Sequence, residues 1–209
     1  QVPINTILAT LSFTFGLHPS YISAIVPNGW TIGTEMTFYA IMPLIFIWVR
    51  NIRASLYFLI FTIIVSKIIC YSVAHFIPFY ISPEITNSID WINFMYMYLP
   101  AQLPVFAIGV LLFFVIKLLN KEAELPFNIK SVGLPLLILS AMLFIDTGLD
   151  KFSTDGLIPD FAIIAFMVFV PFILSLHLIR VKVLVNRLTL YLGKISYSLY
   201  LTHAIVIPW

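Results

Sequence analysis

Apolar runs of bilayer length recur along this chain of 209 residues, and they limit its fold more than any other feature of the sequence. A helix that crosses a bilayer needs about 17–25 mainly apolar residues, and several runs approach or exceed that length. The runs lack the short alternating segments of a membrane β-barrel. Charged residues make up 10% of the chain, whereas a soluble domain has about 25%. The sequence therefore predicts an all-α, polytopic transmembrane helix bundle.

Turn and breaker residues divide the apolar runs into predicted spans. The stretches "LHPS", "VPNGW", "ELPFN" and "DTGLDKFSTDG" interrupt the runs, and no internal repeat of fixed period is visible. We therefore expect one transmembrane domain over residues 1–209. The seven predicted spans are residues 4–17, 33–49, 54–74, 94–116, 131–147, 159–179 and 188–208.

The chain starts at Gln1 and enters its first predicted span at once, without a charged leader or a small-residue cleavage site. We therefore expect no signal peptide, and we interpret the chain as the carboxyl-terminal part of a longer protein that has further helices before it. The single cysteine, Cys70, lies inside an apolar run, so it cannot form an internal disulfide.

Basic residues alternate between the predicted loops. Short cytoplasmic loops of membrane proteins carry an excess of Lys and Arg. Every second loop here is basic, whereas the alternate loops contain Lys151 as their one basic residue. We therefore expect a multi-pass protein of the plasma (inner) membrane, with the basic loops cytoplasmic and the ends that carry Glu35 and Trp209 facing outward. The basic set is Arg50, Arg53, Lys117, Lys121, Lys130, Arg180, Lys182 and Arg187.

Glu35 is the one charged residue in the stretch "NGWTIGTEMTFYAIMPLIFIWV". We expect it in the first turn of the second span, where the helix dipole stabilises an acid by about 0.3–1 kcal/mol. Thr31 or Gly33 is the expected cap of this helix. Tyr39 falls one turn from Glu35 on the same face, and Trp30 lies at the level of the headgroups. The alternative is an ordinary interfacial acid with two members of an aromatic belt.

The last predicted span carries a stripe of polar side chains. Ser196, Tyr200 and His203 follow the helical spacing i, i+4, i+7, and Tyr197 extends the polarity to one side. Such a helix faces protein or a water-filled cavity rather than lipid, although the same side chains also join packed helices. His203 lies roughly 8 Å inside the outer end of its helix. That depth matches Tyr39 and permits a shared cavity in the outer leaflet.

Lys67 and Gln102 are the remaining polar residues of interest inside predicted spans. A lysine at the bilayer centre costs roughly 2.5–3.5 kcal/mol, so it needs a partner or a water path. Gln102 lies between Pro100 and Pro104, at an expected kink. Both residues are candidates for lining a polar passage, and either has a structural alternative. The four histidines and the lone cysteine share no metal-ligand spacing, so we expect no metal, and the net charge of +2 gives no reason to expect nucleic acid.

Three stretches resemble the signatures of the integral-membrane acyltransferase-3 family. "GWTIGTEMTFYAIMP" resembles its W-S-x-x-x-E-x-x-F-Y-x-x-x-P motif, with threonine at the position where serine is common. "LPVFAIGVLLF" is similar to its F-x-x-G segment, and "LGKISYSLYLTHAIVI" to its L-G-x-x-S-Y-x-x-Y-L-x-H helix. The matching residues are Trp30, Glu35, Phe38, Tyr39, Pro43, Phe106, Gly109, Gly193, Ser196, Tyr197, Tyr200, Leu201 and His203.

The resemblance implies an enzyme that moves an acyl group, most often acetyl, from acyl-CoA (acetyl-CoA) to a sugar hydroxyl. The acceptors in the family are envelope polysaccharides, lipopolysaccharide and glycolipids, and the fold has about ten helices. The family also uses a histidine, accompanied by an arginine, in its first helices, and no stretch of this chain corresponds to it. The resemblance thus implies that these 209 residues alone are inactive.

The resemblance also implies roles for the candidate site residues. Glu35 would orient that histidine and stabilise its charge, while Trp30 and Tyr39 would contact the sugar. Lys67 and Gln102 would line the donor path. The remaining candidates would shape the cavity; they are Ser196, Tyr197, Tyr200 and His203.

Two other functions fit the same polar residues. A transporter or flippase would use Glu35, Lys67 and His203 as a polar pathway, but such proteins often contain inverted repeats, and none is visible here. A non-catalytic membrane scaffold would use all the polar residues to join helices. The enzyme is the reading that the three motifs favour.

Overall fold

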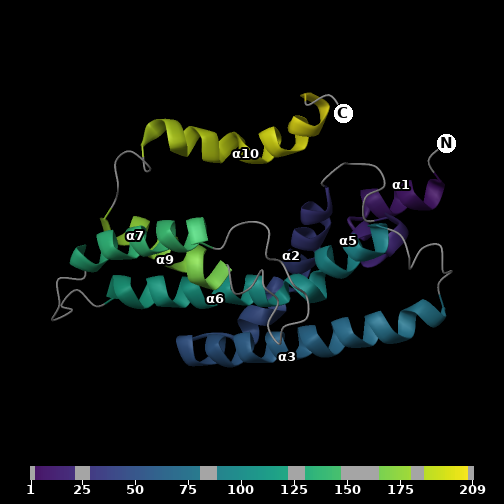
Figure 1. Cartoon of the computed structure of the whole chain (residues 1–209), viewed down its shortest axis with the longest axis horizontal. Helices are drawn as coiled ribbons and strands as arrows, with labels where there is room; N and C mark the ends of the chain where they lie inside the picture. Colours follow the sequence, from purple (N-terminus) through teal and green to yellow (C-terminus); the bar gives the residue numbers. More distant parts are fainter. Residues whose placement is uncertain are drawn as a thin grey trace. The chain divides into compact units, whose positions relative to one another are not determined.

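The computed structural model describes residues 3–21, 29–80, 89–121, 130–146, 165–179 and 186–206. Within these ranges the regular structure is helical and contains no strand, which confirms the predicted all-α class. The α-helices (Figure 1) are α1 (Ile4–Leu11), α2 (Trp30–Trp48), α3 (Ile52–Phe76), α5 (Ile89–Met97), α6 (Leu99–Lys121), α7 (Lys130–Asp146), α9 (Val170–Ile179) and α10 (Arg187–Val206). The short turns are η1 (Phe15–Leu17), η2 (Pro19–Tyr21), η3 (Ile77–Phe79) and the π-helical η4 (Ala165–Phe169).

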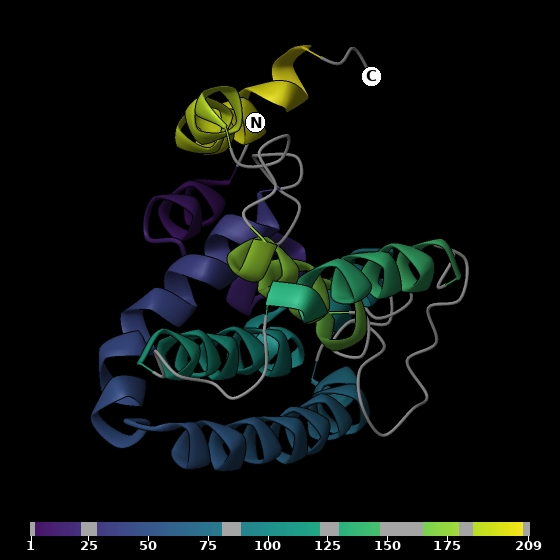
Figure 2. The ribbon, with the colours of Figure 1, turned by 90° about the vertical axis from the view of Figure 1, so that its left-hand side faces the viewer.

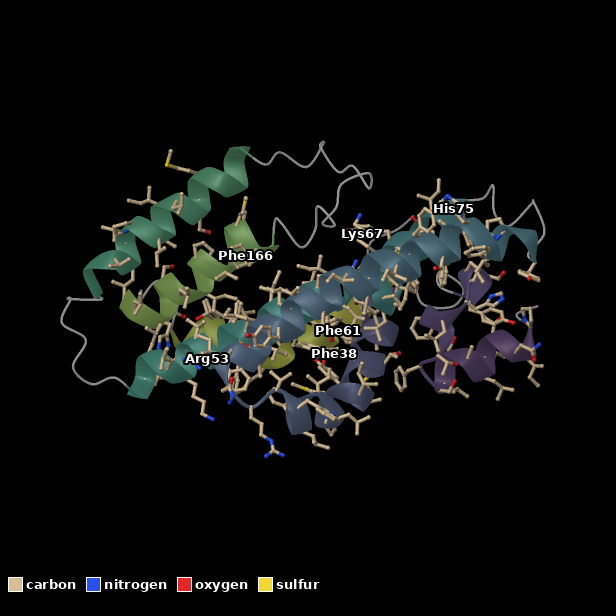
Figure 3. The ribbon with its side chains drawn as sticks, turned by 90° about the horizontal axis from the view of Figure 1, so that it is seen from below. Phe38, Arg53, Phe61, Lys67, His75 and Phe166 are labelled. Atoms are coloured by element: carbon tan, nitrogen blue, oxygen red, sulfur yellow. The ribbon has the colours of Figure 1, made fainter. Side chains whose placement is uncertain are left out.

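Three helical segments of the described chain are long and apolar enough to cross a membrane. They are Trp30–Trp48, Ile52–Phe76 and Trp91–Asn120, of 19, 25 and 30 residues. At 1.5 Å per residue, α3 is about 37 Å long, which exceeds a hydrocarbon core of about 30 Å. Figure 3 shows Arg53 and His75 near opposite ends of α3 with Lys67 between them.

The first predicted span, residues 4–17, is wrong as a single helix, because α1 stops at Leu11. Phe13 adopts a left-handed conformation with a φ of 57°. The amide of Phe13 then donates to the carbonyl of Thr10 (3.2 Å), and the amide of Thr14 donates to that of Ala9 (2.9 Å). These two bonds form a Schellman motif, which satisfies the last carbonyls and ends the helix.

The second predicted span begins earlier than expected. Gly29 is the N-cap of α2, and it makes no side-chain capping bond, so the expected caps Thr31 and Gly33 are wrong. Helix α2 therefore contains no acidic residue in its first turn, and Glu35 lies in the second turn. Because dipole stabilisation fades beyond the first turn, the expected gain from unpaired amides does not apply to Glu35.

The fourth predicted span is two helices, because Pro100 has no N–H and displaces the carbonyl of Tyr96. The chain leaves the helix at Tyr98, between α5 and α6. Beyond this break the amide of Ala101 donates to the carbonyl of Tyr98 (3.1 Å) instead of that of Met97. The carbonyls of Tyr96 and Met97 therefore lose their usual helical donors.

The chain forms two compact units. The first comprises Gln1–Arg50, Ile60–Pro104 and Tyr200–Trp209. Its interior contains the buried rings of Phe94 and Tyr98, and the partly buried residues packed on them include Trp30 and Cys70.

The second unit comprises Asn51–Leu59 and Val105–Leu199. In this unit α7 and α9 lie side by side (Figures 1 and 2). The hydroxyl of Ser140 donates to the carbonyl of Val168 at 2.8 Å. Gly133 allows the close approach, since a Cβ there would come within 2.7 Å of the Cγ1 atom of Ile179.

Candidate functional site

Glu35 is half-buried on α2, between neighbours of opposite exposure. Thr34, which precedes it, is 3% exposed, whereas Met36, which follows it, is 39% exposed. Within the described part of the chain, no donor makes a hydrogen bond or ion pair with the Glu35 carboxylate. The carboxylate therefore lies at the border between the packed and open faces of α2, where no described side chain occupies its oxygens.

Thr34 connects the helix of Glu35 to the break between α5 and α6. Its hydroxyl donates to the carbonyl of Met97 at 2.8 Å. That carbonyl is one of the two that lose a helical donor at the break. A buried acceptor left unpaired costs about 1–3 kcal/mol, so this bond holds the second turn of α2 against the end of α5.

Gly33 brings a second element against the same turn. A Cβ at Gly33 would lie 2.9 Å from the Cζ atom of Phe15, so the ring of Phe15 rests directly on the backbone of α2. Gly16, also in η1, lies near Thr34 at ordinary van der Waals distance, since a Cβ there would lie 3.8 Å from the Thr34 hydroxyl oxygen. The two residues that precede Glu35 are therefore in contact with η1 and with the end of α5.

The two aromatic candidates near Glu35 lie in different surroundings. Trp30 is half-buried, packs on the Phe94 and Tyr98 cluster, and makes an edge contact with Tyr96 at 6.3 Å between ring centroids. Tyr39 is 51% exposed. Trp30 thus helps to place α2, while Tyr39 presents its ring outward.

Gln102 has a structural role that its sequence position explains. Its side chain is 7% exposed. Its amide nitrogen donates to the carbonyl of Tyr96 at 2.7 Å, which is the carbonyl that Pro100 leaves without a donor. Lys67 is half-buried in the middle of α3, and it interacts with another group.

The polar stripe of the last span lies on α10. Ser196 is exposed, and its hydroxyl donates to the carbonyl of Gly193 at 2.8 Å, within its own helix. The side chains of Tyr197, Tyr200 and His203 lie outside the described residues. The predicted cavity shared with Glu35 therefore stays a prediction.

Sequence reasoning missed Thr34 and Tyr98. The partner of Thr34 is a backbone carbonyl 63 residues away, and no side-chain pattern marks such a partner. The one available signal was Pro100, which predicts unpaired carbonyls before it. The Tyr98 hydroxyl, in a ring packed against Cys70, is buried without a hydrogen-bond partner among the described residues.

Comparison with known proteins identifies the class. The model of the acyltransferase-3 family, described as an acyltransferase domain, matches residues 3–209. The chain therefore belongs to this family of membrane acyltransferases, and the predicted resemblance is confirmed. Neither the curated proteins nor the solved structures contain a match.

Proposed function

We propose that this protein is a membrane O-acyltransferase that moves an acyl group, most simply acetyl, from acyl-CoA to a hydroxyl of a sugar. The acceptor is a sugar of an envelope polysaccharide, a lipopolysaccharide or a glycolipid. The observation that carries the proposal is the family match over residues 3–209. The placement of Glu35 adds support, because a carboxylate that no described residue binds lies on a turn that packing holds in place.

Acyl transfer requires a base for the sugar hydroxyl, a positioned thioester and stabilisation of the oxyanion. Glu35 is the hydrogen-bonding partner of the histidine base that the family resemblance implies. It holds the imidazole in one orientation and stabilises the charge that the imidazole gains when it takes the hydroxyl proton. Tyr39 presents an exposed ring one turn away, where it stacks on or hydrogen-bonds the acceptor sugar.

The donor and the acceptor approach from opposite sides of the membrane in this proposal. Acyl-CoA binds from the cytoplasmic side, where the basic loops lie, and the acceptor is handled at the outer end of α2. Lys67 lines the donor path, whereas the hydrogen bond of Gln102 supports a structural role. On α10, Ser196, Tyr197, Tyr200 and His203 shape the cavity.

The test uses membranes from cells that express the intact gene, supplied with acetyl-labelled coenzyme A. Label in extractable glycan or glycolipid is compared between wild type, Glu35→Gln and the control Glu124→Gln at matched protein levels. We expect Glu35→Gln to lose transfer by about 100-fold, because a positioned acid–base group contributes about 10²–10⁴. Glu124→Gln makes the same chemical change between the predicted spans 94–116 and 131–147, outside the candidate site, and should transfer at the wild-type rate.

Two other results would count against the proposal. Equal labelling by wild type and Glu35→Gln would remove Glu35 from the chemistry. Labelling by wild type no higher than by empty membranes would contradict acetyl transfer to these glycans. It would favour a different acyl donor or acceptor, or the transporter or flippase, which needs a gradient and consumes no acyl donor.

A further inference from the structure

We propose that Thr34 is a positioning residue for Glu35. Its hydrogen bond to the carbonyl of Met97 fixes the rotation of α2, and with it the place of the Glu35 carboxylate. The inference rests on the proposed function, since the place of this carboxylate matters only if Glu35 serves acyl transfer. All three residues belong to the same compact unit.

The backbone carbonyl of Met97 needs the Thr34 hydroxyl as its hydrogen-bond donor. The break at Tyr98 redirects the amide of Ala101, which bonds the carbonyl of Tyr98 and not that of Met97. Thr34 is 3% exposed, so water is not at hand to replace its hydroxyl. Because backbone groups inside a membrane protein must find partners within the protein, the 2.8 Å bond from Thr34 is the natural solution for Met97.

The position of the Glu35 carboxylate depends on the backbone of α2. No donor in the described chain holds the Glu35 carboxylate. The orientation of the helix therefore decides where this carboxylate lies. Side-chain ends lie about 5–6 Å from the axis of a helix, so a rotation of α2 by about 10° moves the Glu35 carboxylate by about 1 Å.

Apolar contacts at Gly33 and Trp30 also hold α2 in place, and the Thr34 hydrogen bond adds a directional contact to them. The ring of Phe15 rests on the backbone at Gly33, where a Cβ would lie 2.9 Å from its Cζ atom. A flat ring on a bare backbone is an apolar contact without directional bonds. The Thr34 hydrogen bond is directional, so it selects one rotation of α2.

The chain offers a matched control on the same helix. Thr37 also donates a hydrogen bond through its hydroxyl, at 2.7 Å, but to the carbonyl of Gly33 inside α2. Thr34→Val and Thr37→Val each exchange a hydroxyl for a methyl group. Only Thr34→Val removes a hydrogen bond between two helices. A difference in kcat between the two variants therefore measures the effect of that bond.

The experiment measures steady-state acyl transfer by purified full-length protein for wild type, Thr34→Val, Thr34→Ser and Thr37→Val. We expect Thr34→Val to lower kcat by about 10- to 100-fold, because a displacement of about 1 Å has effects of this size. The donor KM should stay the same, since the Thr34 side chain is buried and bonds the carbonyl of Met97. Thr34→Ser keeps the hydroxyl and should restore most of kcat, and Thr37→Val should have the wild-type kcat.

A double variant tests whether the effect passes through Glu35. Residues that act through one group are non-additive, so Thr34→Val should add little to the loss caused by Glu35→Asp. Equal kcat for Thr34→Val and wild type, or multiplied losses in the double variant, would overturn the inference.

The failure of this inference is distinct from the failure of the proposed function. If Glu35→Gln is inactive while Thr34→Val has the wild-type kcat, the proposed function stands and the positioning role falls. If Glu35→Gln is fully active, the proposed role of Glu35 fails instead. Should Thr34→Val not accumulate in membranes, Thr34→Cys offers a weaker donor of similar size; we expect an intermediate kcat, and a wild-type kcat would overturn the inference.

Discussion

At the scale of one residue, Gln102 supplies the hydrogen-bond donor that Pro100 removes. Pro100 removes the helical donor of the Tyr96 carbonyl, and the Gln102 amide replaces it at 2.7 Å. We expect Gln102→Leu to destabilise the protein by about 1–3 kcal/mol, since it leaves this carbonyl unpaired. Pro100→Ala restores a backbone donor, so Gln102→Leu should cost far less in that background. Thermal midpoints, Tm, of the four detergent-purified proteins measure the cycle.

The same cycle separates the structural role of Gln102 from a role in the donor path. An equal loss of Tm in both backgrounds would contradict the structural account. A raised KM for acyl-CoA that persists in the Pro100→Ala background would instead assign Gln102 to the donor site. The sequence marks Gln102 as unusual because this residue lies between two prolines. The sequence does not identify the carbonyl that accepts the hydrogen bond from its amide.

At the scale of elements, α7 and α9 depend on one glycine. A Cβ at Gly133 would come within 2.7 Å of Ile179 Cγ1 and 3.2 Å of Leu178 Cβ. We expect Gly133→Ala to destabilise the protein by about 1–3 kcal/mol, as overpacking does. Among the described residues, a Cβ at Gly109 would meet nothing within 4 Å, so the control Gly109→Ala should be neutral or stabilise its helix by about 0.5–1 kcal/mol. Tm values check both, and a neutral Gly133→Ala would contradict the close packing.

Element boundaries could be predicted from sequence wherever composition alone decides them. The apolar run of α3 predicts a helix over residues 54–74, and the helix is Ile52–Phe76, because the polar Arg50 and Asn51 precede it and Pro78 follows it. Helix α1 was missed at its end because the residue in the left-handed position is Phe13, where a glycine would have been the signal. The start of α2 was misplaced because Gly29 caps the helix without a side chain.

At the site, Glu35 and Trp30 carry sequence signals, whereas the contact of Thr34 depends on tertiary structure.

At the scale of the whole molecule, the topology is the prediction on which the direction of acyl transfer depends. Helix α3 is long enough to cross the membrane, so its two ends should face opposite sides. The positive-inside bias predicts that the end with Arg50 and Arg53 is cytoplasmic, and that the other end is outer, because the sequence 81–93 contains no Lys or Arg. We therefore expect single cysteines at the two ends of α3, in a Cys70→Ala background, to differ in whether a membrane-impermeant maleimide reaches them from outside the cell.

The reporters are Asn51→Cys and Tyr80→Cys, since both native residues are exposed. A membrane-impermeant maleimide should label Tyr80→Cys in intact cells or spheroplasts, and Asn51→Cys only after permeabilisation. Because α2 ends just before Asn51, this result would place the opposite, Glu35-bearing end of α2 on the outer side. The reverse labelling would place Glu35 at the cytoplasmic side, and the acceptor would then be acylated on the same side as the donor binds.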